Sequence, residues 1–224
     1  MARYERDATM IGEVIVVDDV GVAFGALVAE AFKNRVDHDR FVLGLGGGST
    51  ARSAYECLAR EPIDWSLVTA VWGDERMVPL DHEDSNYRIA KEALFDHVSP
   101  LCDIHPVSDQ TSIESYNGLI KGLQPIDLLH LGMGDDGHTA SLFPNSPALD
   151  VVDSDVIETG DDLHPHRRMT LTFPAINRAR LAVFTITGAK KRDMFERVQS
   201  GDDLPAGKVD SERVVWIVDR LVAG

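Results

Sequence analysis

The stretch richest in chemically capable residues is GMGDDGHTASLFP, Gly132–Pro144, directly after the apolar run Ile126–Leu131. Its first seven residues hold three glycines, two aspartates and a histidine, which is more than a simple turn needs. A histidine has an ordinary pKa of about 6.5 and can act as a general base near neutral pH. Asp136 can orient its ring, and amides near Thr139 can face a developing oxyanion. We therefore predict that His138 and Asp136 are catalytic.

The glycines of this stretch also spell G-x-G-x-x-G, a weak dinucleotide fingerprint. The context disfavours that interpretation. Asp135 and Asp136 would bring negative charge against a pyrophosphate, and Pro144 would end a helix from Thr139 after little more than a turn. A purely structural histidine is the other alternative, and the Gly-Asp-Asp-Gly turn before His138 favours catalysis over it.

A second glycine-rich stretch, LGLGGGSTARSAY (residues 43–55), is typical of an anion-binding turn. Three consecutive glycines leave amides that can face a ligand, and Ser49 and Thr50 add hydroxyls at the start of a helix. The stretch lacks the lysine of a nucleotide P-loop, so ATP binding is unsupported. We predict that Gly47, Gly48 and Ser49 contact a phosphate; a tight strand-to-helix turn is the alternative.

Charged residues elsewhere could complete such a site. VWGDERMVP follows an apolar strand, a position that favours Asp74 and Arg76 facing a ligand, although charge runs are ordinarily solvated. Arg168 begins a later strand, and Lys190 and Lys191 follow a post-strand glycine. In so acidic a chain, an anion site must gather the few cations. We predict that Asp74, Arg76, Arg168 and Lys191 bind substrate; whether Lys190 or Lys191 reaches the phosphate stays open.

Apolar runs alternate with helical patterns along most of the chain. Runs such as VIVV, DLLHL and LAVFTIT are apolar throughout, which is typical of strands covered on both faces. The alternation predicts an α/β fold, a largely parallel open sheet with helices on both faces in a Rossmann-like three-layer sandwich. Ligands bind beyond the carboxyl ends of such strands. The expected strands are 13–17, 41–45, 67–72, 126–131, 169–173, 181–187 and 214–218, with helices capped by Asp18 and by Asp84 or Ser85 and others from about Ala51 and Ala189.

Composition excludes several classes of protein. The 224 residues suit one domain, and no linker, repeat or low-complexity tract divides them. A formal charge of −15 disfavours nucleic acid and anionic membranes as partners. Two cysteines, with no signal-peptide or membrane-spanning pattern, predict a cytoplasmic protein. The sequence carries no signal for oligomeric state.

Taken together, five motifs resemble those of the 6-phosphogluconolactonases, a family related to the glucosamine-6-phosphate deaminases. They are GGGST, GDER-x-VP followed by DSN, G-x-G-x-DGHTASLFP, R-x-TLT and TG-x-x-K. The resemblance covers about residues 43–195, in the right order. It departs at Ala51, where the family usually has proline, a change that costs preorganisation but no hydrogen bond.

This resemblance implies a single sugar-phosphate lactonase domain over residues 1–224. It implies hydrolysis of 6-phospho-D-glucono-1,5-lactone to 6-phosphogluconate in the pentose phosphate pathway, with no metal or organic cofactor. His138 would activate water, with Asp136 beside it. The implied phosphate ligands are Gly48, Ser49, Arg168 and Lys191, with Arg76 lining the same pocket.

Four other functions are alternatives for a chain of this kind. The related deaminases carry I-A-F-N-E-P after Gly-His, with a glutamate that assists ring opening, whereas Thr139–Pro144 holds no carboxylate. A serine hydrolase would need G-x-S-x-G, which the chain lacks. A metal hydrolase could use His164, His166 and nearby aspartates, but these histidines lie in a polar, loop-like stretch. A sugar-phosphate-binding regulator without turnover remains, and His138 would separate it from a hydrolase.

Overall fold

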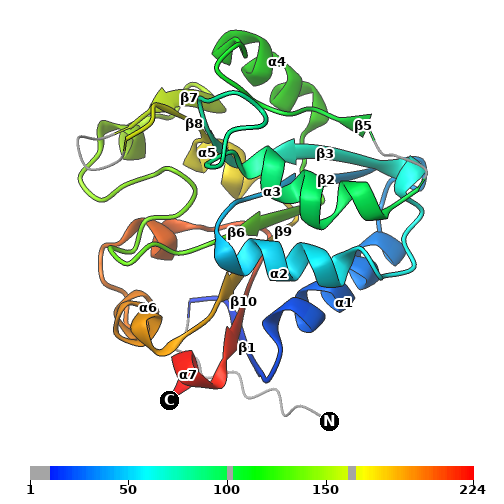
Figure 1. Ribbon diagram of the computed structural model, residues 1–224. Helices are drawn as coiled ribbons and strands as arrows, with labels where there is room; N and C mark the ends of the chain where they lie inside the picture. The colour runs from blue at the N-terminus through cyan, green and yellow to red at the C-terminus, as the bar shows by residue number, and fades with distance from the viewer. Residues whose placement is uncertain (1–10, 100–102, 161–164) are drawn as a thin grey trace.

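The computed structural model describes residues 11–99, 103–160 and 165–224 (Figure 1). A seven-stranded sheet runs in the order β1-β10-β9-β6-β2-β3-β5, and all of its neighbouring strands are parallel. Its strands are β1 (Glu13–Val17), β2 (Phe41–Leu45), β3 (Val68–Trp72), β5 (Asp103–Ile104), β6 (Leu128–Leu131), β9 (Leu181–Ile186) and β10 (Arg213–Asp219). The predicted largely parallel sheet is therefore confirmed.

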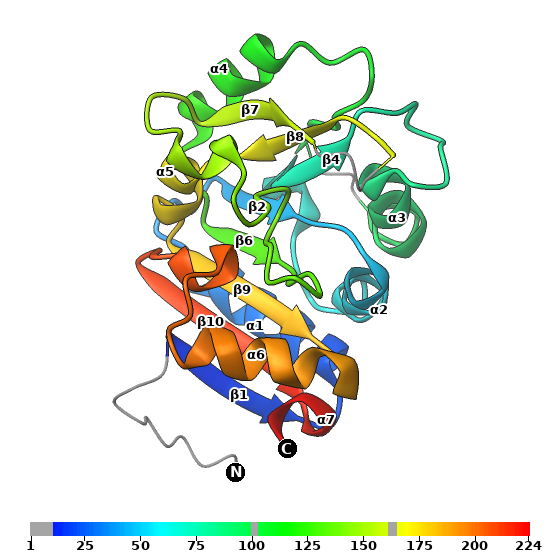
Figure 2. The same cartoon turned by 90° about the vertical axis from the view of Figure 1, so that its left-hand side faces the viewer.

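Helices cover both faces of this sheet, which is why β2, β3, β6 and β9 are buried along their whole length. α1 packs on α2 and α2 on α3, whereas α6 lies on the opposite face from α1 (Figure 2). The α-helices are α1 (Val20–Lys33), α2 (Ser49–Leu58), α3 (Asn86–Ala93), α4 (Ile113–Leu123), α5 (Phe173–Asn177), α6 (Arg192–Gln199) and α7 (Arg220–Ala223). Short 3-10 helices span Trp65–Leu67, Phe95–His97, Pro147–Asp150, Ala189–Lys191 and Pro205–Lys208.

A second, three-stranded antiparallel sheet corrects part of the prediction. It runs β4 (Asp74–Arg76), β8 (Arg168–Leu171), β7 (Val156–Thr159) and lies beside α4 (Figure 2). The strand expected at 169–173 belongs here and not to the parallel sheet. Gly73 joins the two sheets: its amide donates to the Leu45 carbonyl (2.8 Å), and its carbonyl accepts from the Leu171 amide (2.8 Å).

Of the predicted helix caps, the one at Asp18 is wrong and the one at Ser85 is confirmed. Asp19, not Asp18, caps α1 by accepting from the Val22 amide, because Asp18 pairs with Arg220 near the end of the chain. The Ser85 hydroxyl accepts from the Arg88 amide, which confirms it as a cap of α3. Elements α4, β5 and β7 were not anticipated. For α4, the cap Ser112 and the buried pair Tyr116 and Ile120 were available signals.

The order of the strands fixes where a ligand crevice forms. β2 and β6 are neighbours, yet the chain leaves β2 toward β3 and leaves β6 toward β9. Such a reversal opens a crevice at the carboxyl ends of the two strands. The glycine-rich stretches at residues 46–48 and 132–137 directly follow β2 and β6. Among the described residues, no helix is long and apolar enough to cross a membrane.

Candidate active site

A cavity of about 190 Å³ opens at this crevice and is bordered by the small antiparallel sheet. A second cavity of about 150 Å³ adjoins it, because residues 46–48 and 130–133 line both. Of the predicted site residues, the first cavity is lined by Gly47, Gly48, Asp74, Arg76, His138 and Arg168, and the second by Gly47, Gly48 and Lys191. Ser49 begins α2, and its side chain lies outside the described part of the structure.

Asp136 contacts His138 twice, through Oδ1. The carboxylate lies 2.6 Å from the imidazole Nδ1 and accepts from the His138 amide at 3.1 Å. Phe143 packs against the ring on another side, with ring centroids 4.8 Å apart. A Cβ on Gly134 would stand 2.1 Å from Nδ1, so only glycine leaves room for the ring in this position. The imidazole is therefore fixed by its own loop.

The Asp136 carboxylate sets the tautomer of the ring. Burial favours the neutral carboxyl, but the amide and imidazole of His138 outweigh it and hold the Asp136 pKa below its ordinary value. An ionised carboxylate accepts the Nδ1 proton, so in the neutral ring the lone pair lies on Nε2. This arrangement gives His138 the form that a general base requires.

Two arginines lie side by side on neighbouring strands of the antiparallel sheet. Arg76 on β4 is directly opposite Arg168 on β8, so both side chains project from the same face of the sheet. Like charges in that position destabilise a strand pair, and burial of Arg168 to 7% exposure increases the cost. Both side chains line the first cavity, where a bound anion would offset their repulsion.

Glu75 was not predicted to belong to the site. It stabilises the side of the cavity that carries Arg76 and Arg168. Its buried carboxylate accepts from the amides of Arg76 (2.7 Å), Asn86 (2.8 Å) and Tyr87 (2.7 Å). These contacts tie β4 to the first turn of α3, where a negative charge is favourable. Burial nevertheless raises the Glu75 pKa to about 7. Arg76 itself is held by the Asp84 carbonyl (2.7 Å).

The glycine turn after β2 rests on a buried network. The Tyr55 hydroxyl accepts from the Gly46 amide (2.8 Å) and lies 3.0 Å from His130 Nδ1; His130 Nε2 lies 2.8 Å from Thr185 Oγ1. Burial lowers the His130 pKa to about 3, so this ring is neutral. A Cβ on Gly47 would stand 1.8 Å from the Asn86 amide oxygen. His130 was missed because it lies inside an apolar strand, and Tyr55 was missed because it lies inside a helix.

Lys191 is the lysine that lines the second cavity. Its ammonium lies 2.5 Å from Asp135 Oδ1 and donates to the Met133 carbonyl (2.8 Å), and the pair lowers the Asp135 pKa. Lys190 is exposed. Asp135 is 83% exposed at its side chain, so an incoming anion can compete for the ammonium at modest cost.

Asp74 is the single carboxylate that lines the first cavity within the described ranges. Its Oδ2 accepts from the Ser141 hydroxyl at 2.7 Å, and the carboxylate is buried. Residues 139–142 form a tight turn closed by the Leu142 amide and the Thr139 carbonyl (2.9 Å). The turn thus presents a hydroxyl to Asp74 and adds no second carboxylate.

Comparison with known proteins identifies the family of this chain. A family model for glucosamine-6-phosphate isomerases/6-phosphogluconolactonase matches residues 17–216. The chain belongs to this family. A 6-phosphogluconolactonase from Synechocystis is 35% identical over 94% of each chain. One from Mycobacterium tuberculosis is 34% identical over 81% of this chain and 83% of its own.

Solved structures of the family share the whole fold. The 6-phosphogluconolactonase from Thermotoga maritima matches with a TM-score of 0.81 at 30% identity, covering 92% of this chain and 99% of its own. The one from Shewanella baltica gives 0.82 at 26% identity, covering 94% and 99%. A monomeric glucosamine-6-phosphate deaminase also matches, with 0.76 at 20% identity. The description of the family model names two chemistries, and the residues of the cavity must distinguish them.

Proposed function

We propose that this protein is a 6-phosphogluconolactonase, a cytoplasmic carboxylic ester hydrolase of the oxidative pentose phosphate pathway, with residues 1–224 as one catalytic domain. One observation carries the proposal: an imidazole oriented by Asp136 lines the same cavity as the facing arginines Arg76 and Arg168. That cavity combines a base for water with a site for a phosphate. The identity to 6-phosphogluconolactonases over most of the chain supports this substrate.

In the proposed reaction His138 acts first as base and then as acid. Nε2 takes a proton from water as the water oxygen bonds to the lactone carbonyl carbon. Amides of the loop near Thr139 stabilise the resulting oxyanion. The bond from that carbon to the ring oxygen then breaks, and the imidazolium returns its proton to the departing oxygen. General base catalysis of this kind contributes about 10²–10⁴-fold.

The phosphate lies, in this proposal, where the two cavities meet. Gly47, Gly48 and Ser49 supply backbone and hydroxyl donors at the start of α2. Arg168 and Arg76 reach the phosphate from the first cavity and Lys191 from the second. Binding at a remote phosphate orients the lactone carbon and lowers the barrier to its hydrolysis. No metal or organic cofactor enters the proposed steps.

The isomerising deaminase is the weaker candidate. The turn that follows His138 supplies Ser141 to Asp74, and no carboxylate stands between residues 139 and 144. Ring opening of an amino sugar would lack the glutamate that the deaminase motif provides. The geometry around His138 also favours turnover over simple binding, because a binding protein has no use for an oriented base.

A substrate panel tests the proposal. Purified protein is mixed with freshly made 6-phosphogluconolactone, with unphosphorylated gluconolactone and with glucosamine 6-phosphate, and acid or ammonia release is recorded. We expect fast acid release from the phosphorylated lactone, well above its hydrolysis in buffer, and a much slower reaction with the unphosphorylated one. Ammonia release, or a lactone rate equal to that in buffer, would overturn the assignment.

A further inference from the structure

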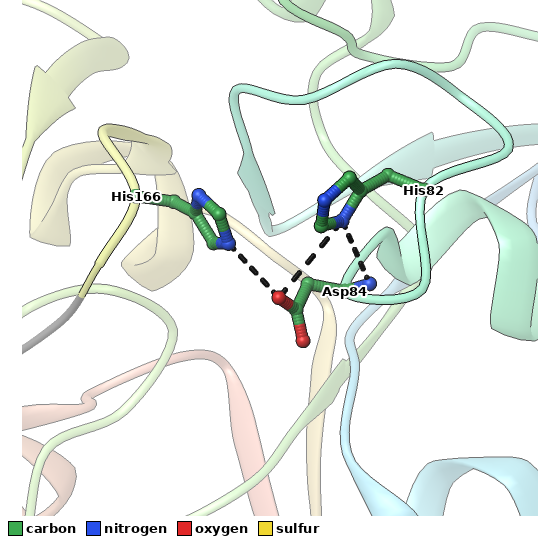
Figure 3. Close-up of side chains that lie close together, drawn as sticks. All are labelled: His82, Asp84 and His166. Atoms are coloured by element: carbon green, nitrogen blue, oxygen red, sulfur yellow. Dashed lines mark hydrogen bonds and ion pairs between the residues drawn. The ribbon is translucent and has the colours of Figure 1, made fainter.

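A cluster of three metal-ligating side chains lies outside both cavities. His82 and Asp84 come from the loop between β4 and α3, and His166 comes from the segment just before β8. Figure 3 shows the two rings and the carboxylate converging from these separate segments. None of the three lines either cavity described above. The hydrolysis proposed above makes no use of them.

The spacing of the donor atoms suits one small cation. His166 Nε2 lies 2.9 Å and His82 Nδ1 lies 3.9 Å from Asp84 Oδ2, and the three ligand atoms all lie within 4.8 Å of one another. A tetrahedral ion with bonds of about 2.0–2.2 Å holds its ligand atoms about 3.3–3.6 Å apart. Small rotations of two half-exposed rings would bring all three atoms to that spacing.

The ligand types indicate which cation. Two imidazoles and a carboxylate are ligands for Zn²⁺ and its first-row neighbours, whereas Mg²⁺ and Ca²⁺ prefer all-oxygen sets. Three protein ligands leave a fourth position for water. The rings meet edge to face, with centroids 5.3 Å apart at 80°, so neither blocks the other from a shared ion. The loop is acidic, because Asp81 and Glu83 flank His82.

Existing contacts already support the cluster. The Met77 amide donates to the Arg167 carbonyl (2.8 Å), which joins the strand beside the loop to the residue after His166. The Asp84 carbonyl accepts from Arg76 (2.7 Å), which fixes the backbone that carries the carboxylate. The Asp84 amide donates to His82 Nδ1 (3.1 Å), so that nitrogen presents its lone pair toward the Asp84 backbone.

We propose that His82, Asp84 and His166 bind one Zn²⁺ ion at a site separate from the sugar-phosphate cavity. The ion links the β4–α3 loop to the segment before β8, next to the wall that carries Arg76 and Arg168. A metal ion binds imidazole nitrogens that carry no proton, so affinity falls as the pH is lowered. The ion plays no part in the lactone chemistry.

Zinc binding to the full-length chain tests this site. Metal-stripped protein is titrated with ZnCl₂ by calorimetry, and Co²⁺ is used as a spectroscopic substitute whose visible absorption reports a tetrahedral site. We expect one equivalent of Zn²⁺ and no binding of MgCl₂. His166→Asn and His82→Asn should each weaken binding by at least about 10-fold, because even residues behind a ligand have effects of that size.

His38→Asn is the matched control, because His38 is an exposed histidine remote in sequence from the cluster; it should bind zinc like the wild type. Circular dichroism tests whether each variant is folded. If a variant does not fold, the Co²⁺ spectrum of the wild type decides whether the tetrahedral site exists. The proposal is overturned if the wild type takes up no zinc at micromolar concentration. Unchanged affinity in folded His166→Asn and His82→Asn would overturn it equally, because the zinc would then lie elsewhere.

Discussion

The two walls of the cavity are built in opposite ways. The catalytic wall, with Asp136 and His138, is one short loop after a parallel strand, and the two contacts that orient the imidazole join residues two apart in the sequence. The cationic wall pairs Arg76 with Arg168, brought together by an antiparallel register between distant segments. A local motif thus encodes the proposed base, whereas the proposed anion site depends on how two sheets meet at Gly73.

The largest expected effect is on the catalytic wall. His138→Gln keeps a polar side chain of similar reach but removes the base, so kcat should fall by about 10²–10⁴-fold. Binding of the product 6-phosphogluconate, measured by calorimetry, should change little, because the cationic wall is intact. A variant with wild-type turnover would remove His138 from the chemistry.

The second largest loss of rate is expected when the space beside the imidazole Nδ1 is filled. Gly134→Ala places a methyl group where His138 Nδ1 lies, and a displacement of about 1 Å can cost about 10²-fold in rate. Gly118→Ala on α4 is the control, because a Cβ there also meets nothing within 4 Å and Gly118 lines neither cavity. Equal kcat in the two variants would show that the position of the ring does not matter.

The cationic wall should respond differently. Arg168→Ala removes a buried charge from the proposed phosphate site, so KM for the phosphorylated lactone should rise about 10–100-fold, as expected for a charge-assisted contact of about 1.5–3 kcal/mol. The rate with unphosphorylated gluconolactone should barely change. Arg197→Ala, on the exposed face of α6, serves as the control. Equal losses with both substrates would argue that Arg168 supports the fold and does not bind phosphate.

The paired lysines allow a finer test. Lys191→Met should raise KM by about 10-fold, because one charge-assisted hydrogen bond is lost. Lys190→Met should have no effect, since Lys190 is exposed beside it and lines neither cavity. Steady-state kinetics of the two variants answer which lysine contacts the phosphate. The reverse pattern would assign that role to Lys190.

The smallest effect concerns the buried support of the glycine turn. Burial lowers the His130 pKa to about 3, so below pH of about 6.5 the unfolded chain binds a proton that the native state does not. The stability contributed by the neutral ring is present above that pH and is lost as the pH falls, by up to about 1.4 kcal/mol per pH unit. His130→Asn should lose this dependence. Denaturant unfolding of both proteins at pH 7 and pH 5 measures the difference.

Glu75 also makes the stability depend on pH, so wild type and His130→Asn must be compared at the same pH. Burial raises the Glu75 pKa to about 7, so its stabilising neutral form is lost as the pH rises from about 4.5 through 7. Its slope therefore opposes that of His130 in part of the same range. The quantity to compare is the difference between wild type and variant at each pH. A difference that stays constant between pH 7 and pH 5 would contradict the assignment to His130.

The parallel sheet and its loops could be predicted from the sequence, whereas the small antiparallel sheet could not. Apolar runs such as those of β2 and β9 identify a parallel sheet, and glycines and polar residues after strands identify the loops that meet at its edge. The small sheet was missed because β4 is three residues of charge, Asp74–Arg76, with no apolar alternation. Its partner β8 resembles a buried parallel strand.

Long-range contacts account for the rest. The Arg76–Arg168 register, the Ser141–Asp74 hydrogen bond and the His82–Asp84–His166 cluster each join segments that no local pattern connects. His166 was considered for a metal site only with its sequence neighbours. His164, the other histidine of that stretch, lies outside the described residues. The spatial partners of His166 come from the loop that holds Asp84, which lies 82 residues earlier in the sequence.

The most direct measurement of the central claim is a crystal structure of the wild-type protein with 6-phosphogluconate. The phosphate should accept hydrogen bonds from Arg168 and from the turn at Gly48. The carboxylate that derives from the lactone carbonyl should lie within hydrogen-bond reach of His138 Nε2, about 2.6–3.2 Å. A phosphate bound away from both arginines, or a carboxylate turned away from the imidazole, would contradict a single cavity that holds the phosphate and activates water.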